Sequence, residues 1–435
     1  MELKSQIRQV WKLSLPAILT QITTIVMQYI DSAMVGALGA HASAAIGLVA
    51  SSTWLLGGVT SAVSTGFSVQ VAHHIGGKQE AQARNVLRHG LITSLILSGV
   101  LCLVSALLSE SLPVWLGGEA AILGDASDYF LVFALMLPFS QLNSLTASCL
   151  QCSGDMITPS LLNAAMCVLD VVLNAIFIPI YGVLGAGIGT ALACGIISLI
   201  MAWHCCIHNP QLRLKRQEPF QFDPGILRSA FRIGMPVAVQ EIAMCSAMVV
   251  STRIIAPLGS VAIAANSFAI TAESLCYMPG YGVGSAATTV VGRSIGAGNG
   301  ALAKRYGTIC TSMGGILMGI TGMIMAIICP LVFILLTPDP EVRDLAAQVL
   351  RIGLLAEPLF GISIAAAGAL RGTGDTFIPS LMILGNIWIV RIGLALLLVP
   401  YFGLHGMAIA MTVELWIRGL LMLYRHKTSK YYHIH

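Results

Sequence analysis

The sequence predicts an all-α integral membrane protein with twelve transmembrane helices. These helices form two six-helix lobes related by a pseudo-two-fold axis along the membrane normal. Three observations predict this fold class: long apolar runs, the distribution of basic residues, and an internal repeat. The chain has 435 residues, of which 56% are hydrophobic and only 10% are charged. A soluble domain carries about 25% charged residues.

The apolar runs give the number of spans. A run of roughly 18 or more apolar residues predicts a membrane-spanning helix. The N-terminal run resembles a signal peptide because Lys4, Arg8 and Lys12 precede it, but it is too long and contains Asp31. We therefore count it as the first span. The twelve predicted spans are centred near residues 25, 59, 98, 139, 170, 194, 243, 275, 321, 357, 390 and 414.

The basic residues predict the orientation. Most of the 23 Lys and Arg fall in alternate connections that share one side with both termini, whereas the other connections are acidic or neutral. Basic residues favour the cytoplasmic side of a membrane protein. We therefore expect both termini in the cytoplasm. The net charge of +4 reflects this orientation and does not indicate nucleic-acid binding.

The two halves of the chain repeat one pattern. "WKLSLPAILTQI" from Trp11 matches "FRIGMPVAVQEI" from Phe231, and "LQCSGDMITPSL" at 150–161 matches "LRGTGDTFIPSL" at 370–381. Both matches have an offset of 220 residues. Six spans in each half leave the halves in the same orientation, a build common in transporters. We predict lobes at 1–205 and 229–424, a cytoplasmic linker at 206–228 and a cytoplasmic tail at 425–435.

Four oxygen-bearing side chains in the first lobe predict a cation site. Asp31 is the only charge between residues 13 and 38, Asp170 and Asn174 share one face of span 5, and Thr190 lies in span 6. A rise of 1.5 Å per residue places all four roughly 10–16 Å from the outer ends of their spans. Oxygen ligands suit Na⁺, and burial together with like charge favours a retained proton. Interhelical hydrogen bonds without an ion are the alternative for Asp170 and Asn174.

The second lobe lacks this set. Ser251 matches Asp31, and Arg391 matches Asp170. Arg391 and Glu414 on adjacent spans predict a structural ion pair. Three further glutamates, Glu241, Glu273 and Glu357, lie near the expected midplane without an evident cationic partner. Gln21 in span 1 is the residue that matches Glu241. These four residues are candidates for lining a cavity that attracts a cationic substrate, and structural hydrogen bonding is the alternative for the glutamates.

Several function classes receive no support. We find no clustered nucleophile, metal set or phosphate loop, so we expect neither an enzyme nor an organic cofactor. The cysteines lie mostly in apolar runs and predict core residues. A channel more often assembles symmetric pores from short segments. A lipid or lipid-linked oligosaccharide flippase of related architecture stays as the alternative, although its pyrophosphate needs a strongly cationic cavity.

The chain resembles the multidrug and toxic compound extrusion (MATE) transporters over nearly all its length, and the prokaryotic branch in particular. The resemblance is carried by "LPAILTQITTIVMQYIDSAMVGALG", "MPGYGVGSAATTVVGRSIGAGN" and "GALRGTGDTFIPSL". It implies a secondary antiporter of the bacterial inner membrane that exports amphipathic organic cations in exchange for Na⁺ or H⁺ by alternating access. We expect it to work as a monomer.

The resemblance also suggests roles for individual residues. Asp31 matches the span 1 aspartate that takes part in cation coupling, and Thr190 falls at a ligand position of the family. Asp170 and Asn174 match a span 5 motif, although the acid comes first here. Glu241 lies about one turn nearer the start of span 7 than the family's coupling glutamate.

Overall fold

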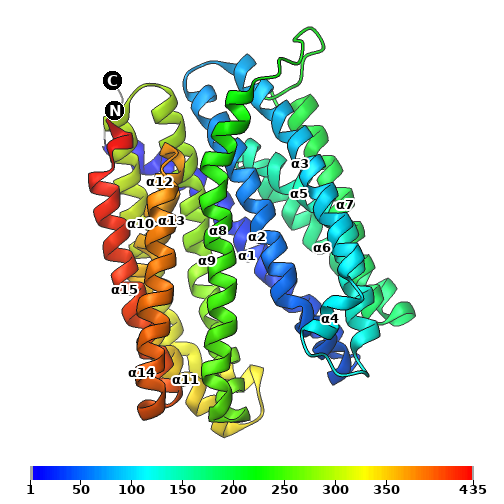
Figure 1. Cartoon of the computed structure of the whole chain (residues 1–435). Coiled ribbons are helices and arrows are strands. Elements are labelled where there is room, and N and C mark those ends of the chain that lie inside the picture. The colour runs from blue at the N-terminus through cyan, green and yellow to red at the C-terminus, as the bar shows by residue number, and fades with distance from the viewer. Residues whose placement is uncertain (1–2, 434–435) are drawn as a thin grey trace. The chain divides into compact units, whose positions relative to one another are not determined.

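A computed structural model describes residues 3–433, and these residues form helices joined by short connections (Figure 1). Within this range, eleven helices are long and apolar enough to cross a membrane. A further pair, bent by 54° at a short break, makes a twelfth span. The predicted all-α fold with twelve transmembrane helices is therefore confirmed.

The first six spans come from the N-terminal half of the chain. Helices α5 and α7 pack against each other, and both α2 and α3 pack against α5. The short helix α4 and the π-helical turn η1 are the other elements of this half. The elements are α1 (Leu3–Gly36), α2 (Ala40–Gly76), α3 (Glu80–Leu108), α4 (Ser111–Trp115), α5 (Leu123–Cys152), α6 (Ile157–Tyr181), α7 (Val183–Trp203) and η1 (His204–His208).

The C-terminal half supplies the other six spans. Four of them join consecutive helical pieces: α8 with η2, α11 with α12, α13 with η3 and α14, and α15 with η4. The elements are α8 (Pro224–Ile255), η2 (Ala256–Leu258), α9 (Ser260–Gly296), α10 (Gly300–Leu336), α11 (Pro340–Leu354), α12 (Glu357–Thr373), α13 (Phe377–Gly385), η3 (Asn386–Ile392), α14 (Gly393–Phe402), α15 (Leu404–Thr428) and η4 (Lys430–Tyr432).

The chain divides into two compact units, each described here by itself. The N-lobe unit holds residues 23–238, and the C-lobe unit holds the residues up to 22 and those from 239 onward. The boundaries between these two units fall inside α1 and α8. The sequence instead predicts that the lobes meet at the linker, residues 206–228. The reason for the observed boundaries is local packing. Gly66 and Gly234 bring α2 and the start of α8 into backbone contact, and Ile18 of α1 packs against Gly282 of α9.

The backbone carries the internal repeat. Positive φ angles, which favour glycine because it lacks a Cβ atom, occur at matched positions in the two halves. The pairs, at offsets of 220 or 221 residues, are Gly39 with Gly259, Lys78 with Gly298, Gly154 with Gly374, and Gly182 with Gly403. The same turns therefore connect equivalent spans in both halves.

The bent span has a local cause. Pro358 occupies the first turn of α12, and a proline has no N–H to donate to the residue four positions earlier. The helix accordingly ends at Leu354 and restarts at Glu357. Proline alone does not force the break, because Pro138, the matching residue of the first half, lies inside the continuous helix α5.

Candidate cation site

Asp31 and Asn174 meet inside the N-lobe unit. The Nδ2 group of Asn174 on α6 donates a hydrogen bond of 2.9 Å to Oδ1 of Asp31 on α1. Asn174 is fully buried, and Asp31 is partly buried. The contact joins two residues 143 positions apart in the chain. It therefore depends on how α1 and α6 pack.

Asp170 lies one helical turn before Asn174 on α6 and is also fully buried. Its carboxyl group neighbours that of Asp31. Neither carboxylate oxygen of Asp170 has a hydrogen-bond partner, and Oδ1 of Asn174 has none either. An ionised carboxylate without a partner is costly to bury in a membrane protein. The arrangement is therefore suited to a proton on Asp170 or to a cation beside it.

A cavity of about 170 Å³ adjoins Asp170. This volume is enough for several water molecules. Thr190 on α7 lines the cavity, so the structure brings this predicted ligand to the same space as Asp170. Three methionines and a cysteine supply most of the apolar wall. The lining residues are Met27, Met136, Ser140, Asn143, Met166, Asp170, Thr190, Ala193 and Cys194.

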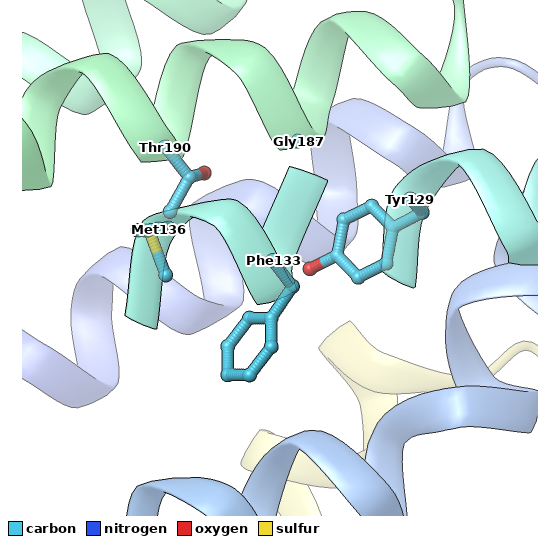
Figure 2. A pocket seen from close by; sticks show the side chains of 5 residues that line it. All are labelled: Tyr129, Phe133, Met136, Gly187 and Thr190. Atoms are coloured by element: carbon cyan, nitrogen blue, oxygen red, sulfur yellow. The ribbon is translucent and has the colours of Figure 1, made fainter. Parts of the chain in front are cut away.

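A narrower pocket shares Met136 and Thr190 with this cavity. Figure 2 shows Thr190 on α7 near Met136 of α5, with Tyr129 and Phe133 farther along α5. Tyr129 is close enough to Asp31 and Asp170 to interact electrostatically with both carboxyl groups. Sequence reasoning missed Tyr129, because a tyrosine near the outer end of a span is ordinarily an interfacial residue.

Asn143 and Ser140 were also missed. Both line the cavity from α5, and Oδ1 of Asn143 is buried without a hydrogen-bond partner. The amide oxygen is thus a further acceptor on the same cavity as Asp170. The run "SQLNS" at 140–144 is polar within an otherwise apolar span. That local polarity was the signal that could have identified Asn143.

Gly189 makes the site possible. A Cβ atom at this position on α7 would collide with Oδ1 of Asn174 and lie 3.0 Å from its backbone nitrogen. The missing side chain lets α6 and α7 approach closely, which is the usual role of glycine between membrane helices. The close approach of α6 and α7 at Gly189 is therefore part of how the site is built.

Gln21 and Glu241 lie elsewhere. Gln21 is ten residues before Asp31 on α1, about 15 Å along the helix axis, and belongs to the C-lobe unit. Glu241 on α8 belongs to that unit as well and is partly buried. Neither residue lines the cavity beside Asp170. Their assignment to a substrate cavity stays a prediction.

Glu273 and Glu357 lie close together inside the C-lobe unit. Glu357, the first residue of α12, is fully buried, and Glu273 on α9 is 6% exposed. Their carboxyl groups interact electrostatically. Both oxygens of Glu357 and Oε1 of Glu273 have no hydrogen-bond partner. These two glutamates are therefore buried in the unit, and their role in attracting a substrate stays a prediction.

Glu414 is also buried, but its carboxylate has several hydrogen-bond partners. Its carboxylate accepts hydrogen bonds from Arg391 at 2.6 Å, from Arg418 at 2.7 Å and from Asn386 at 2.8 Å. Asn386 and Arg391 are both presented by the π-helical turn η3. The predicted ion pair between Arg391 and Glu414 is present, and the bonds to Arg418 and Asn386 extend it into a network. These contacts favour a structural role.

The fold and this site define a class of protein. Twelve spans in two repeated halves, with an unpartnered buried carboxyl beside a cavity, are typical of secondary transporters. The MatE family model matches the chain twice, at residues 16–176 and at residues 236–397. The two matches start 220 residues apart, which is the offset of the internal repeat. The chain belongs to the MATE family of membrane transporters.

Relatives named for multidrug resistance align with most of the chain. It is 27% identical over 447 residues to the probable multidrug resistance protein NorM of Thermotoga maritima, covering 96% of this chain and 91% of that protein. It is 25% identical over 394 residues to the multidrug resistance protein NorM of Burkholderia vietnamiensis, covering 87% and 84%.

Solved structures share the fold. A MATE transporter of Vibrio cholerae, VcmN, superposes with a TM-score of 0.92 at 18% identity, covering 98% of this chain and 97% of that one. A MOP superfamily transporter of Pyrococcus furiosus gives a TM-score of 0.90 at 21% identity, covering 97% and 95%. At such identities the likeness concerns the fold alone.

Proposed function

We propose that this protein is a secondary active antiporter that exports amphipathic, cationic organic compounds in exchange for Na⁺ or H⁺. Its NorM relatives are named as multidrug resistance proteins, and export of the drugs is the means of resistance in this proposal. The observation that carries the coupling to a cation is Asp170, a fully buried carboxyl with two unpartnered oxygens beside a cavity. Such a group costs free energy unless a proton or a cation neutralises it.

Four groups would hold the coupling cation. Asp170 supplies two free carboxylate oxygens, Asn174 a free amide oxygen, and Thr190 a hydroxyl on the wall of the same cavity. Asp31 is joined to this set through the Nδ2 group of Asn174. Oxygen donors of this kind suit Na⁺ and also suit a proton shared between two carboxyl groups. Asn143 extends the acceptor set into the cavity.

The link to movement is the helix that carries Asp31. Residues 23–36 of α1 belong to the N-lobe unit, while the residues before them belong to the C-lobe unit. A cation that binds between Asp31 and Asp170 replaces the repulsion of two carboxylates by attraction to one charge. The second half of α1 is then drawn toward α6, which changes the space available to the substrate. Alternating access couples this change to substrate release.

The orientation and location belong to the same proposal. Both termini lie in the cytoplasm of a bacterium, the chain resides in the inner membrane, and a single copy is the transporting unit. The orientation is supported by the basic residues, most of which fall in connections that share one side with both termini.

Liposomes reconstituted with the purified protein test this function. An imposed inward Na⁺ or H⁺ gradient should drive a fluorescent organic cation in the opposite direction, and the gradient that works identifies the ion. The Asp31→Asn and Asp170→Asn variants should lose gradient-driven transport. Asp125→Asn, which changes an exposed acid at the start of α5, should retain it. Movement of a lipid-linked oligosaccharide without any effect of a cation gradient would instead establish the flippase alternative.

A further inference from the structure

His89, at the end of α3 that meets the linker, makes contacts that the transport function does not use. The side chain is 2% exposed. Its ring packs against Phe220 and Phe222 of the linker, with centroid separations of 4.8 Å and 5.9 Å. The two phenylalanine residues are themselves exposed on their other faces. His89 therefore holds a segment that would otherwise present two aromatic rings to its surroundings.

The two hydrogen bonds of the ring fix its protonation state. Nδ1 lies 2.8 Å from the carbonyl oxygen of Asn85, which can only accept a hydrogen bond. Nε2 lies 3.0 Å from the backbone nitrogen of Asp223, which can only donate one. Nδ1 must therefore carry a hydrogen, and Nε2 must carry a lone pair. The observed contacts require a neutral ring.

The bond from Asp223 fixes the start of α8. Oδ1 of Asp223 accepts a hydrogen bond of 2.8 Å from the backbone N–H of Gly225, next to Pro224, where α8 begins. Asp223 thus caps the helix with its side chain while its own N–H is held by His89. Residues 224–238 of α8 belong to the N-lobe unit, and the rest of α8 belongs to the C-lobe unit. The ring therefore secures the end of a helix that both units share.

The other linker contacts are indifferent to pH near neutrality. Arg84 forms two hydrogen bonds with Glu218, at 2.7 Å and 2.8 Å, and Arg88 donates to the carbonyl oxygen of Lys215 at 2.9 Å. From α2, uncharged Gln70 donates to the carbonyl oxygen of Ile226. The charged side chains of these contacts are arginine, lysine and carboxyl groups, which ordinarily keep their charge between pH 5.5 and pH 7.5. They are Arg84 and Arg88 on α3 and Lys215, Glu218 and Asp223 on the linker.

We propose that His89 is a proton-sensitive latch. The neutral ring holds the linker and the first turn of α8 on the N-lobe unit, and the protonated ring releases them. A proton on Nε2 would place two N–H groups opposite each other, so the bond from the Asp223 N–H to the ring is lost. Acid on the linker side of the membrane therefore loosens the linker and the start of α8 from α3.

Hydrogen exchange of the detergent-solubilised full chain tests the latch. We expect protection of the hydrogen-bonded amides of Asp223, Gly225 and Ile226 to fall about fivefold between pH 7.5 and pH 5.5, after correction for intrinsic exchange. A fivefold change in protection corresponds to the free energy that one ordinary hydrogen bond contributes. His89→Gln should remove the pH dependence because glutamine does not titrate. His89→Phe should give low protection at both values.

His74→Gln is the matched control, because His74 is a partly exposed histidine at the end of α2. This variant should respond to pH as the unmodified protein does. Protection of the outer half of α3 reports whether each variant is folded. The proposal is overturned if protection of the Asp223, Gly225 and Ile226 amides is the same at both pH values in the unmodified protein. It is also overturned if His89→Gln loses protection at pH 5.5 as the unmodified protein does. Neither outcome depends on which ion or substrate is transported.

Discussion

The amide of Asn174 donates its hydrogen bond to Asp31 at 2.9 Å, while its oxygen, directed elsewhere, has no partner. One side chain thus anchors α1 and also offers a free acceptor next to the Asp170 carboxyl. The amide of Asn174 therefore connects the helix that carries Asp31 to the site beside Asp170. The first two predictions concern the surroundings of Asn174.

Replacing Asp170 with asparagine should abolish coupling without unfolding the protein. Asparagine keeps the size of the side chain and removes the charge that attracts the cation. A hydrogen bond or contact to a charged group is worth about 1.5–3 kcal/mol, so cation affinity should fall roughly tenfold to a hundredfold. Isothermal titration with Na⁺, or proton release on substrate addition, measures this loss. Unchanged affinity at normal expression would remove Asp170 from the site.

Replacing Gly189 with alanine should impair transport although no charge changes. The added methyl group meets Oδ1 of Asn174, so Asn174 has to shift and its hydrogen bond to Asp31 is disturbed. Overpacking of this kind costs about 1–3 kcal/mol. Gly195→Ala on the same helix is the control, because its methyl group would meet only Phe139 at 4.0 Å. Equal transport rates for the two variants in liposomes would contradict the role given to Gly189.

Glu414 and Glu357 should respond in opposite ways to the same substitution. Glu414→Gln leaves Arg391 and Arg418 without their shared buried carboxylate, and breaking a buried pair costs about 3–5 kcal/mol. Glu357→Gln removes a buried acid that has no partner, so the thermal midpoint should stay the same or rise. Thermal unfolding in detergent compares the two variants directly. A larger loss of stability for Glu357→Gln would show that its carboxylate has a partner.

Glu218 should hold the linker through the neutral pH range. The hydrogen bonds from Arg84 hold the pKa of this carboxyl below its ordinary value. A lowered folded-state pKa gives a contribution that is present above the unfolded value, about 4.3, and is lost as the pH falls through the folded value. At pH 8, Glu218→Gln should therefore speed tryptic cleavage after Arg213, Lys215 or Arg216.

Glu80→Gln serves as the control for that experiment. Glu80 also approaches Arg84, but at 3.6 Å and with a side chain that is 47% exposed. Exposed pairs of this type contribute little to stability. Cleavage of the Glu80→Gln variant should match that of the unmodified protein. Equal acceleration by both variants would mean that any acid near Arg84 holds the linker.

Sequence reasoning found most of the fold because the membrane makes the signal local. Backbone groups in hydrocarbon must be satisfied within each helix, so every span appears as a long apolar run. The repeat appears as shared proline and glycine positions. Sequence reasoning did not locate the bend between α11 and α12. Pro358 at the bend matches Pro138, which lies in an unbroken helix, so the proline alone gave no signal. Whether a proline breaks a span depends on what packs against the freed carbonyl groups.

The candidate site was only partly accessible from the sequence. Asp31, Asp170, Asn174 and Thr190 could be selected because polar groups are rare within spans and helical rise gives their depth. Tyr129 could not be assigned, because its part in the site depends on the direction in which α5 turns its side chains, whereas the polar run at 140–144 was a signal for Asn143. Sequence and depth also treat Glu357 and Glu414 alike, although one is unpartnered and the other accepts bonds from three side chains.

The sequence by itself determined the twelve helices, their division into two equivalent halves, and the presence of acids in only one half at the levels of Asp31 and Asp170. Hydropathy and repetition are properties of the chain order, so they need no tertiary structure. Only the tertiary structure decided which carboxyl groups are neutralised and which remain available, and that His89 holds the linker as a neutral ring. Those outcomes depend on contacts shorter than about 3.5 Å between residues far apart in the chain, and such contacts are set by helix packing.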